Sequence, residues 1–210
     1  MLAVEYRNAS FELPLKTAAD LLKRSGTVEA GSNAVLRLSI SPVEGAELQS
    51  LTSRLGAGLS LVSSEDSKGS KGEEGSVYRI RAVLSDGDKV TEISHFGSFQ
   101  PFLTLVLDGE LDDRVTVVLA YDEATGGFRP IPALIEQKDG RSVVAIRSLT
   151  TGTFLLAHAA PITFADVAGH WARRDIELLA SKRIANGLTA DRFAPDSRVT
   201  RAEFAALLAR

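Results

Sequence analysis

The chain has 210 residues, of which 44% are hydrophobic and 24% are charged, a balance that is ordinary for a globular protein with a buried core. The formal net charge of -3 does not favour nucleic acid or an anionic membrane as a partner. The absence of cysteine excludes disulfides, thiolate metal sites and cysteine nucleophiles. No apolar run is long enough to cross a bilayer, and the first residues enter a strand pattern without the features of a signal peptide.

Residues 1–160 read mainly as short strands separated by turn-forming residues. Apolar and polar side chains alternate in Ala34–Ile40, as expected of a strand with one buried face. An Asp-Gly pair within Ser85–Asp88 predicts a β-hairpin. The other predicted strands are Val77–Leu84, Lys89–Ile93, Phe102–Leu107, Val115–Tyr121, Phe128–Ile135, Ser142–Arg147 and Thr153–His158. Many short strands at this spacing predict a β-sandwich or a partly closed barrel.

Two helices interrupt the strands. Thr17 can cap a helix over Ala18–Arg24, and leucines at helical spacing before Gly56 predict a second helix over Ala46–Leu55. The segment Ser63–Gly75 is polar and rich in glycine. Because this segment lacks the carboxylate pattern of an EF-hand loop, we interpret it as a solvated linker rather than a metal site.

From Thr163 onward the pattern becomes helical, beginning with TFADVAGHWARRDIELLASKRIANG. A helix is predicted to begin near His170-Trp171. Asp166 is placed to cap this helix, because a carboxylate accepts hydrogen bonds from exposed N–H groups at a helix start. Asn186-Gly187 is expected to end the helix through a left-handed turn.

A second helix is predicted after the polar turn. Thr200 and Glu203 form a Thr-x-x-Glu capping box at its start. Its packing face is expected to consist of Ala202, Phe204, Ala205 and Leu208. The two helices form a core too small to stand alone, so we expect them to pack on copies of themselves or on the preceding domain. The predicted fold is therefore mainly β with helices: a β-sandwich-like domain over residues 1–160, then a helix–loop–helix repeat over residues 161–210.

The order of these C-terminal motifs resembles an S-layer homology (SLH) repeat. The motifs are an Asp, a His-Trp pair, an amphipathic helix, Asn-Gly, Phe-x-Pro and Thr-Arg-Ala-Glu. The resemblance implies a helical module that holds bacterial exoproteins on cell-wall polysaccharide. Such repeats usually occur in threes, with grooves between them that bind secondary cell-wall polymer, often through a pyruvylated sugar. The segment is then a single repeat from a longer array, and Arg183 stands where the family usually has glycine.

The resemblance also implies particular ligand contacts. Arg201 would contact the carboxylate of the pyruvyl ketal on the sugar, because a guanidinium forms paired hydrogen bonds with a carboxylate. Trp171 would be the platform for a sugar ring. Asn186 and Gly187 would allow close approach of the backbone to the polymer.

These assignments have structural alternatives. Trp171, the only tryptophan, can instead be a core residue. Thr200 and Glu203 can serve only as a capping box, and Asp166 supports the fold rather than binding. Arg201 lies in a first helical turn, where the helix dipole disfavours a cation, and this misfit favours a role in binding.

Residues from Val115 onward resemble the β-rich segments that precede SLH repeats in bacterial surface proteins, through Tyr121-Asp122, Phe128 and Pro130. That resemblance carries no activity with it. The three histidines share no metal-ligand spacing, and neither a nucleophile elbow nor a phosphate-binding glycine loop is present. We predict no catalytic residue, no metal and no cofactor.

The sequence thus indicates a non-enzymatic part of an extracellular protein of the cell wall or S-layer. The SLH repeat would anchor the parent exoprotein to secondary cell-wall polysaccharide, with residues 1–160 as a spacer and further SLH repeats as partners. Neither nucleic acid nor membrane insertion is expected. One alternative is that the β domain is a carbohydrate-binding or glycan-processing accessory module of a surface glycoside hydrolase. Another is an assembly module that pairs an open strand edge with a neighbour.

Overall fold

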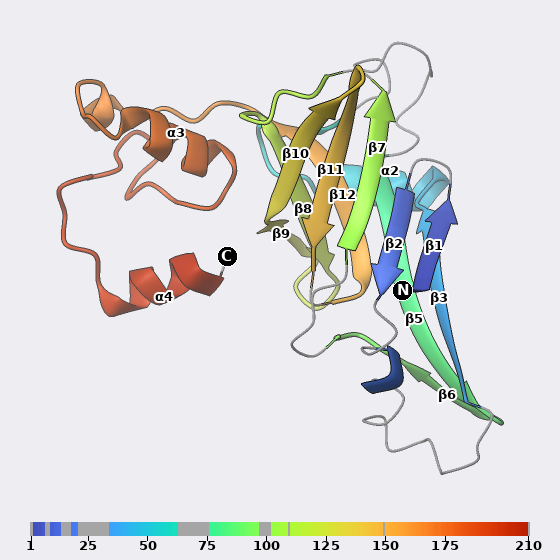
Figure 1. The fold of residues 1–210 in the computed structure, drawn as a ribbon. Helices are drawn as coiled ribbons and strands as arrows, with labels where there is room; N and C mark the ends of the chain where they lie inside the picture. The colour runs from blue at the N-terminus through green and yellow to red at the C-terminus, as the bar shows by residue number, and fades with distance from the viewer. Residues whose placement is uncertain are drawn as a thin grey trace.

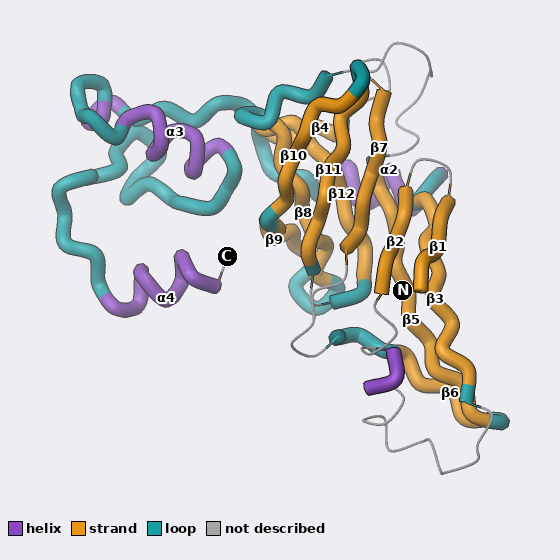
Figure 2. Tube along the Cα trace, in the orientation of Figure 1, coloured by secondary structure: helices purple, strands orange, loops and turns teal. Residues whose placement is uncertain are grey.

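The computed structural model describes residues 2–6, 9–13, 18–20, 34–62, 76–96, 102–108, 110–148 and 150–209. Two antiparallel β-sheets pack face to face, and helices follow them at the C-terminal end (Figure 1, Figure 2). The mainly β, sandwich-like architecture predicted from the sequence is confirmed.

The first sheet has five strands in the order β1-β2-β7-β11-β10. Their bounds are β1 Leu2–Tyr6, β2 Ala9–Leu13, β7 Phe102–Asp108, β11 Arg141–Arg147 and β10 Ala133–Lys138. The second sheet has seven strands, with β3-β5-β12-β8-β9 as its continuous path, β4 paired with β12 and β6 paired with β5. Their bounds are β3 Val35–Pro42, β4 Leu59–Leu61, β5 Val77–Asp86, β6 Lys89–Glu92, β8 Thr116–Asp122, β9 Gly127–Ile131 and β12 Gly152–Ala159.

Pro132 separates two strands where the sequence predicts one. The expected strand Phe128–Ile135 is divided between β9 and β10, which belong to different sheets. Pro132 has no backbone N–H to donate to a ladder, and the chain passes from one sheet to the other at this residue, whereas Pro130 lies within β9, at the edge of its sheet. The prediction of a single strand is therefore wrong.

One strand was not predicted from the sequence, and two predictions fall wholly or partly outside the described residues. Strand β4 was not predicted, because its three residues are too few to show a period. The predicted helix over Ala18–Arg24 is described only as far as Asp20, and Ser63–Gly75 lies outside the described residues.

The space between the sheets is filled by apolar side chains from both. Phe11 of β2, Ile80 of β5 and Leu156 of β12 are each no more than 2% exposed. Burial of a side chain of this size contributes about 1.5–3 kcal/mol. This shared layer is therefore the main source of stability for the sandwich.

The outer face of the seven-stranded sheet is partly covered by α2, Gly45–Ser53, where the sequence predicts a helix over Ala46–Leu55. Leu48 and Leu51 of α2 are buried in a second cluster with Val117 of β8. Because one face of the helix lies on the sheet, the loop that follows α2 is held beside β12.

Strand β12 leaves the sandwich beside this loop, where the Ala160 N–H donates to the Gly58 carbonyl at 2.7 Å. The following segment, residues 161–209, is here called the C-terminal module. It contains the short 3-10 helix η1 Ala165–Val167, α3 Arg173–Ser181 and α4 Arg201–Ala209. The module lies to one side of the sandwich, and α4 lies apart from α3 (Figure 1). Within the described ranges, every helix is too short or too polar to span a membrane.

Candidate functional site

The C-terminal module has its own small apolar core. Phe164, Val167, Ile176 and Ala180 are buried together, with Phe193 packed against them. The rings of Phe164 and Phe193 lie 5.4 Å apart between centroids. The core therefore joins the entry to the module, one face of α3 and the loop that precedes α4.

Gly187 is required at one edge of this core. A Cβ added there would lie 2.4 Å from Cε1 of Phe164 and 2.6 Å from the Thr189 carbonyl oxygen. Such contacts are far inside van der Waals distance, so only glycine fits without a shift of the surroundings. In this structure the space beside Gly187 is occupied by the Phe164 ring and by the carbonyl oxygens of Thr189 and Arg192. Asn186, immediately before Gly187, is exposed.

The turn that ends α3 lies earlier than the sequence predicts. It is formed at Arg183, with φ 61°, and not at Asn186-Gly187. The Arg183 N–H donates to the Ala180 carbonyl and the Ile184 N–H to the Leu179 carbonyl, both at 2.9 Å. These two bonds define a Schellman motif, in which the left-handed residue directly follows the C-cap. The expectation that Asn186-Gly187 ends the helix is therefore wrong.

Asp166 does not cap α3 as expected. Its carboxylate accepts hydrogen bonds from the N–H groups of Phe193 at 2.9 Å and Ala194 at 2.7 Å. The residue that precedes α3, Ala172, has no side-chain cap. The bond from Phe193, joined by the one from Ala194, lowers the pKa of the Asp166 carboxyl. Asp166 thus holds the loop before α4, including Ala194 with φ 61°.

Thr200 and Glu203 bond to each other at the start of α4. The Thr200 N–H and hydroxyl both donate to Oε2 of Glu203 at 2.8 Å, and the Glu203 N–H donates back to the Thr200 hydroxyl at 3.2 Å. This is the reciprocal pattern of a capping box. The bonds from Thr200 lower the pKa of Glu203.

The packing face predicted for α4 is exposed. All side chains of this helix from Arg201 to Leu207 are exposed to solvent, and Phe204 retains 58% of its accessible surface. The expectation that Ala202, Phe204 and Ala205 are packed is therefore wrong for this chain on its own, and the side chain of Leu208 lies outside the described residues. Helix α4 offers an uncovered apolar surface.

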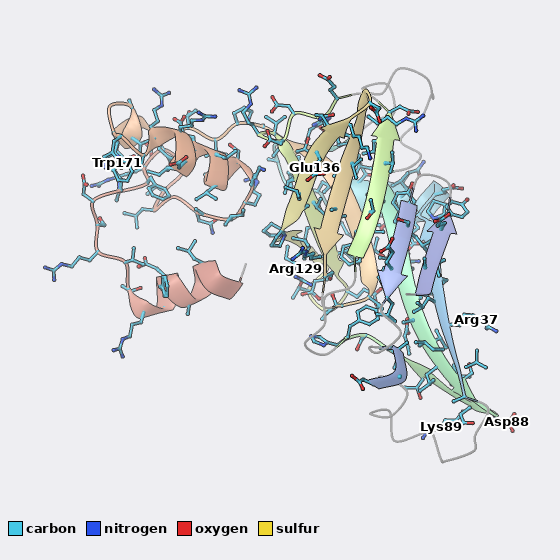
Figure 3. All side chains as sticks on the ribbon, in the orientation of Figure 1. Arg37, Asp88, Lys89, Arg129, Glu136 and Trp171 are labelled. Carbon is cyan, nitrogen blue, oxygen red and sulfur yellow. The ribbon has the colours of Figure 1, made fainter. Side chains whose placement is uncertain are left out.

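Trp171 is exposed. It retains 88% of its accessible surface, so its interpretation as a core residue is wrong. Its ring lies 5.4 Å from that of His170. The His170 Nδ1 accepts from the Ala172 N–H at 3.2 Å, and Nε2 lies 3.6 Å from a carboxylate oxygen of Asp196. The indole is thus presented to solvent beside a ring that is fixed by its own contacts (Figure 3).

Arg201 is also presented to solvent, but at a different place. It opens α4, and it makes no hydrogen bond or ion pair with any residue that the structure describes. Among the described residues, no hydrogen bond, ion pair or cation–π contact joins Arg201 to Trp171. The two predicted ligand contacts are therefore both accessible, and the structure does not bring them into contact.

The sandwich carries a separate polar cleft of about 410 Å³ at one end of the seven-stranded sheet. Its lining combines arginines, carboxylates and a tyrosine, and includes Arg79, Arg81, Arg129, Glu92, Glu123 and Tyr121. Sequence reasoning missed this cleft, because its residues come from strands far apart in the chain. Among the described side chains, no group of three or more His, Asp or Glu residues is arranged to hold a metal ion.

Residues 163–205 match the S-layer homology domain family. This match agrees with the resemblance drawn from the motifs, and the chain therefore carries an SLH domain. SLH domains anchor surface proteins to the cell wall. No solved structure matches the chain at a significant level.

The chain is also similar to parts of three curated proteins, spanning only 4–6% of their lengths. An amylopullulanase of Thermoanaerobacterium thermosulfurigenes is 30% identical over 115 residues, 51% of this chain. An endo-1,4-beta-xylanase of Thermoanaerobacterium saccharolyticum is 45% identical over 49 residues, 23% of the chain. An exoglucanase of Acetivibrio thermocellus is 45% identical over 47 residues, 22% of the chain. The amylopullulanase match is longer than the C-terminal module, so it includes part of the sandwich.

Replacement of Gly187 by alanine is expected to destabilise the C-terminal module by about 1–3 kcal/mol, the usual cost of overpacking. The added methyl group would collide with Phe164 and the neighbouring carbonyls. Native-state hydrogen exchange at the amides of α3, which carries Ile176 and Ala180 of the core, measures the effect. Gly169→Ala is the matched control, because a Cβ at Gly169 meets nothing within 4 Å. Equal stability of the two variants would contradict the packing role of Gly187.

The contribution of the Asp166 carboxylate is expected to depend on pH. Because its pKa is lower in the folded module, the stabilisation is complete above the ordinary carboxyl pKa of about 3.9 and is lost as the pH falls through the lowered value. Hydrogen exchange at the Phe193 and Ala194 amides, corrected for intrinsic rates, should show this loss of protection.

The variant Asp166→Asn should lose protection at neutral pH, because an amide offers one acceptor oxygen and places a donor against the second N–H. Asp191→Asn is the control, since the Asp191 carboxylate accepts only from the Thr189 hydroxyl, at 2.7 Å. Unchanged exchange in Asp166→Asn would exclude the carboxylate as the group that holds the loop.

Proposed function

We propose that the SLH domain holds its parent protein on a secondary cell-wall polysaccharide that carries pyruvylated sugars, outside the cell. The observation that supports this most directly is the exposure of Trp171, which retains 88% of its accessible surface, whereas Phe164 is buried in the module core with Phe193 packed against it. An aromatic ring with no protein neighbour over its outer face is suited to stack on the apolar face of a sugar.

The contact of the indole with the ring of His170 also supports a binding role. The His170 side chain is only 18% exposed, and its Nδ1 accepts a hydrogen bond from the Ala172 N–H at 3.2 Å. A ring packed against it loses less conformational entropy on binding than a freely rotating side chain. We therefore assign Trp171 as the sugar platform and His170 as the residue that positions it.

Arg201 is the proposed contact for the acidic group. A pyruvyl ketal carries a carboxylate, and a guanidinium can donate two parallel hydrogen bonds to it. Arg201 has no competing partner among the described residues, and the first turn of α4 adds a positive field that favours an anion. Asn186, with an exposed amide, is proposed as a further contact for sugar hydroxyls, while Gly187 serves the packing beneath it.

The separation of Arg201 from Trp171 fits a groove completed by a neighbour. The exposed apolar face of α4, with Phe204 and Leu207 at 58% and 40% exposure, is a surface that a further SLH repeat of the parent chain would cover. In this proposal, residues 161–210 form one repeat of an array, and residues 1–160 form a β-rich spacer that carries no catalytic group.

The second candidate is that the β domain is a carbohydrate-binding or glycan-processing accessory module. Three features favour it: the names of the relatives, the extension of the amylopullulanase match into the sandwich, and the polar cleft. Titration of residues 1–160 with soluble starch, xylan and cellulose oligosaccharides discriminates between the candidates. A spacer binds none of them, whereas an accessory module binds at least one and loses binding in Arg81→Ala.

Trp171→Ala should weaken retention on purified cell walls about ten-fold, because aromatic stacking is worth up to about 1.5 kcal/mol. The folded state should be unaffected, since the indole is exposed. Co-sedimentation of the protein with cell walls measures retention, with the chain extended by its following SLH repeats tested in parallel. Val199→Ala, another exposed apolar side chain at 63%, is the control. Full retention of Trp171→Ala would exclude the platform role.

Arg201→Ala should reduce retention roughly ten- to hundred-fold, since a hydrogen bond between charged groups is worth about 1.5–3 kcal/mol. Arg201→Lys should recover only part of the loss, because an ammonium group cannot form the paired bonds. Arg198→Ala removes the same charge three residues away and is the control. Chemical removal of pyruvate from the polymer should abolish the difference between wild type and Arg201→Ala. An equal loss in both arginine variants would point to general charge attraction instead.

A further inference from the structure

Arg183 occupies a backbone position that glycine favours. Its φ of 61° places it in the left-handed region, where the Cβ of an L-residue is crowded. It is the left-handed residue of the Schellman motif that ends α3, the position most often occupied by glycine. An arginine here makes the helix end less stable than glycine would, so the side chain should have a compensating contact.

That contact lies on the sandwich. Nη2 of Arg183 donates to the carbonyl oxygen of Ala57 at 2.8 Å, in the loop Gly56–Gly58 between α2 and β4. Nε of Arg183 is buried at this contact, without a hydrogen-bond partner among the described residues. A Cβ on Gly58 would lie 3.5 Å from Nη2 of Arg183. The side chain therefore lies directly against this loop.

The same loop also holds the connection between the sandwich and the module. The Ala160 N–H donates to the Gly58 carbonyl at 2.7 Å, and a Cβ on Gly58 would meet the Ala160 Cβ at 3.2 Å. Two residues further on, the Ile162 N–H donates to the Ser181 hydroxyl at 2.8 Å, and that hydroxyl donates to the Glu177 carbonyl at 2.7 Å. The connection is thus bonded to the sandwich at one end and to α3 at the other.

We propose that the Gly56–Gly58 loop is a docking surface for the chain's own SLH domain, and that Arg183 is the residue that fixes the domain on it. The loop presents the carbonyl oxygen of Ala57 to Arg183. Because Gly58 has no side chain, the connecting segment and the guanidinium can both lie close to the loop backbone. Arginine at this position makes the end of α3 less stable than glycine would, but it forms the hydrogen bond to Ala57. The wall-binding module then has one orientation relative to the sandwich, whichever polymer it binds, so the inference does not depend on the proposed ligand.

The orientation can be measured directly, because the chain contains no cysteine. Gln49→Cys on α2 and Arg174→Cys on α3 place two spin labels at exposed positions on either side of the contact. Double electron–electron resonance on the full chain should give one narrow distance distribution. Adding Arg183→Gly should raise the population of other distances roughly two- to ten-fold, the equilibrium change that corresponds to one net hydrogen bond.

Two further variants keep the test specific. Arg183→Asn also tolerates a positive φ and also lacks the guanidinium, so it should broaden the distribution in the same way. Lys182→Ala removes a neighbouring charge and should leave it narrow. Hydrogen exchange at the Ile184 amide should stay slow in the glycine variant, because the helix end gains stability there. A narrow distribution in both Arg183 variants, or equal broadening in Lys182→Ala, would overturn the proposal.

Discussion

The C-terminal module depends on polar contacts because its apolar core is very small. Phe164, Val167, Ile176 and Ala180 are its buried members, and burial at about 25 cal/mol per Å² offsets only part of the entropy lost in ordering the whole segment. The Asp166 carboxylate offsets a further part of this entropy cost by accepting hydrogen bonds from two successive N–H groups of the loop. The ring contact between Phe193 and Phe164 and the bond from the Ala165 N–H to the Asp191 carbonyl hold the same loop.

The small size of the apolar core also explains why some large apolar side chains of the module remain exposed to solvent. An apolar cluster of four buried residues cannot also enclose the indole of Trp171 or the apolar face of α4. The two exposures nevertheless have different meanings. Trp171 stands beside a fixed imidazole among polar groups, as a ligand contact would, whereas Phe204 and Leu207 lie on one bare helix, as a protein interface would.

In the sandwich, apolar burial rather than polar contacts is the main source of stability, because two sheets share a continuous apolar layer and α2 covers part of the outer face. It can therefore serve as a rigid base for a weakly stable module. Arg183 adopts its unfavourable backbone conformation at the boundary between the two, where it reaches Ala57. Local strain at this boundary is consistent with a contact that sets orientation, since neither unit alone requires an arginine there.

Several features follow from the sequence alone because they depend on residues only a few positions apart. The alternation in β3 and β5, the leucine spacing of α2 and the Thr200–Glu203 capping box are local patterns of this kind. The order of motifs after Thr163 was sufficient for the SLH domain, because the family is defined by that order. The break at Pro132 could not be located from local sequence, because Pro130, two residues earlier, lies within a strand.

Tertiary structure alone decided the partners of individual groups. Asp166 precedes a helix and is a plausible cap for it from the sequence. Its carboxylate oxygens instead accept hydrogen bonds from the N–H groups of Phe193 and Ala194, which lie 27 and 28 residues later. Arg183 binds a carbonyl 126 residues away. The burial of a lone tryptophan depends on whether the rest of the chain can surround it. Hydrogen bonding and burial are set by distance in space, and a local pattern carries no information about which distant residue arrives there.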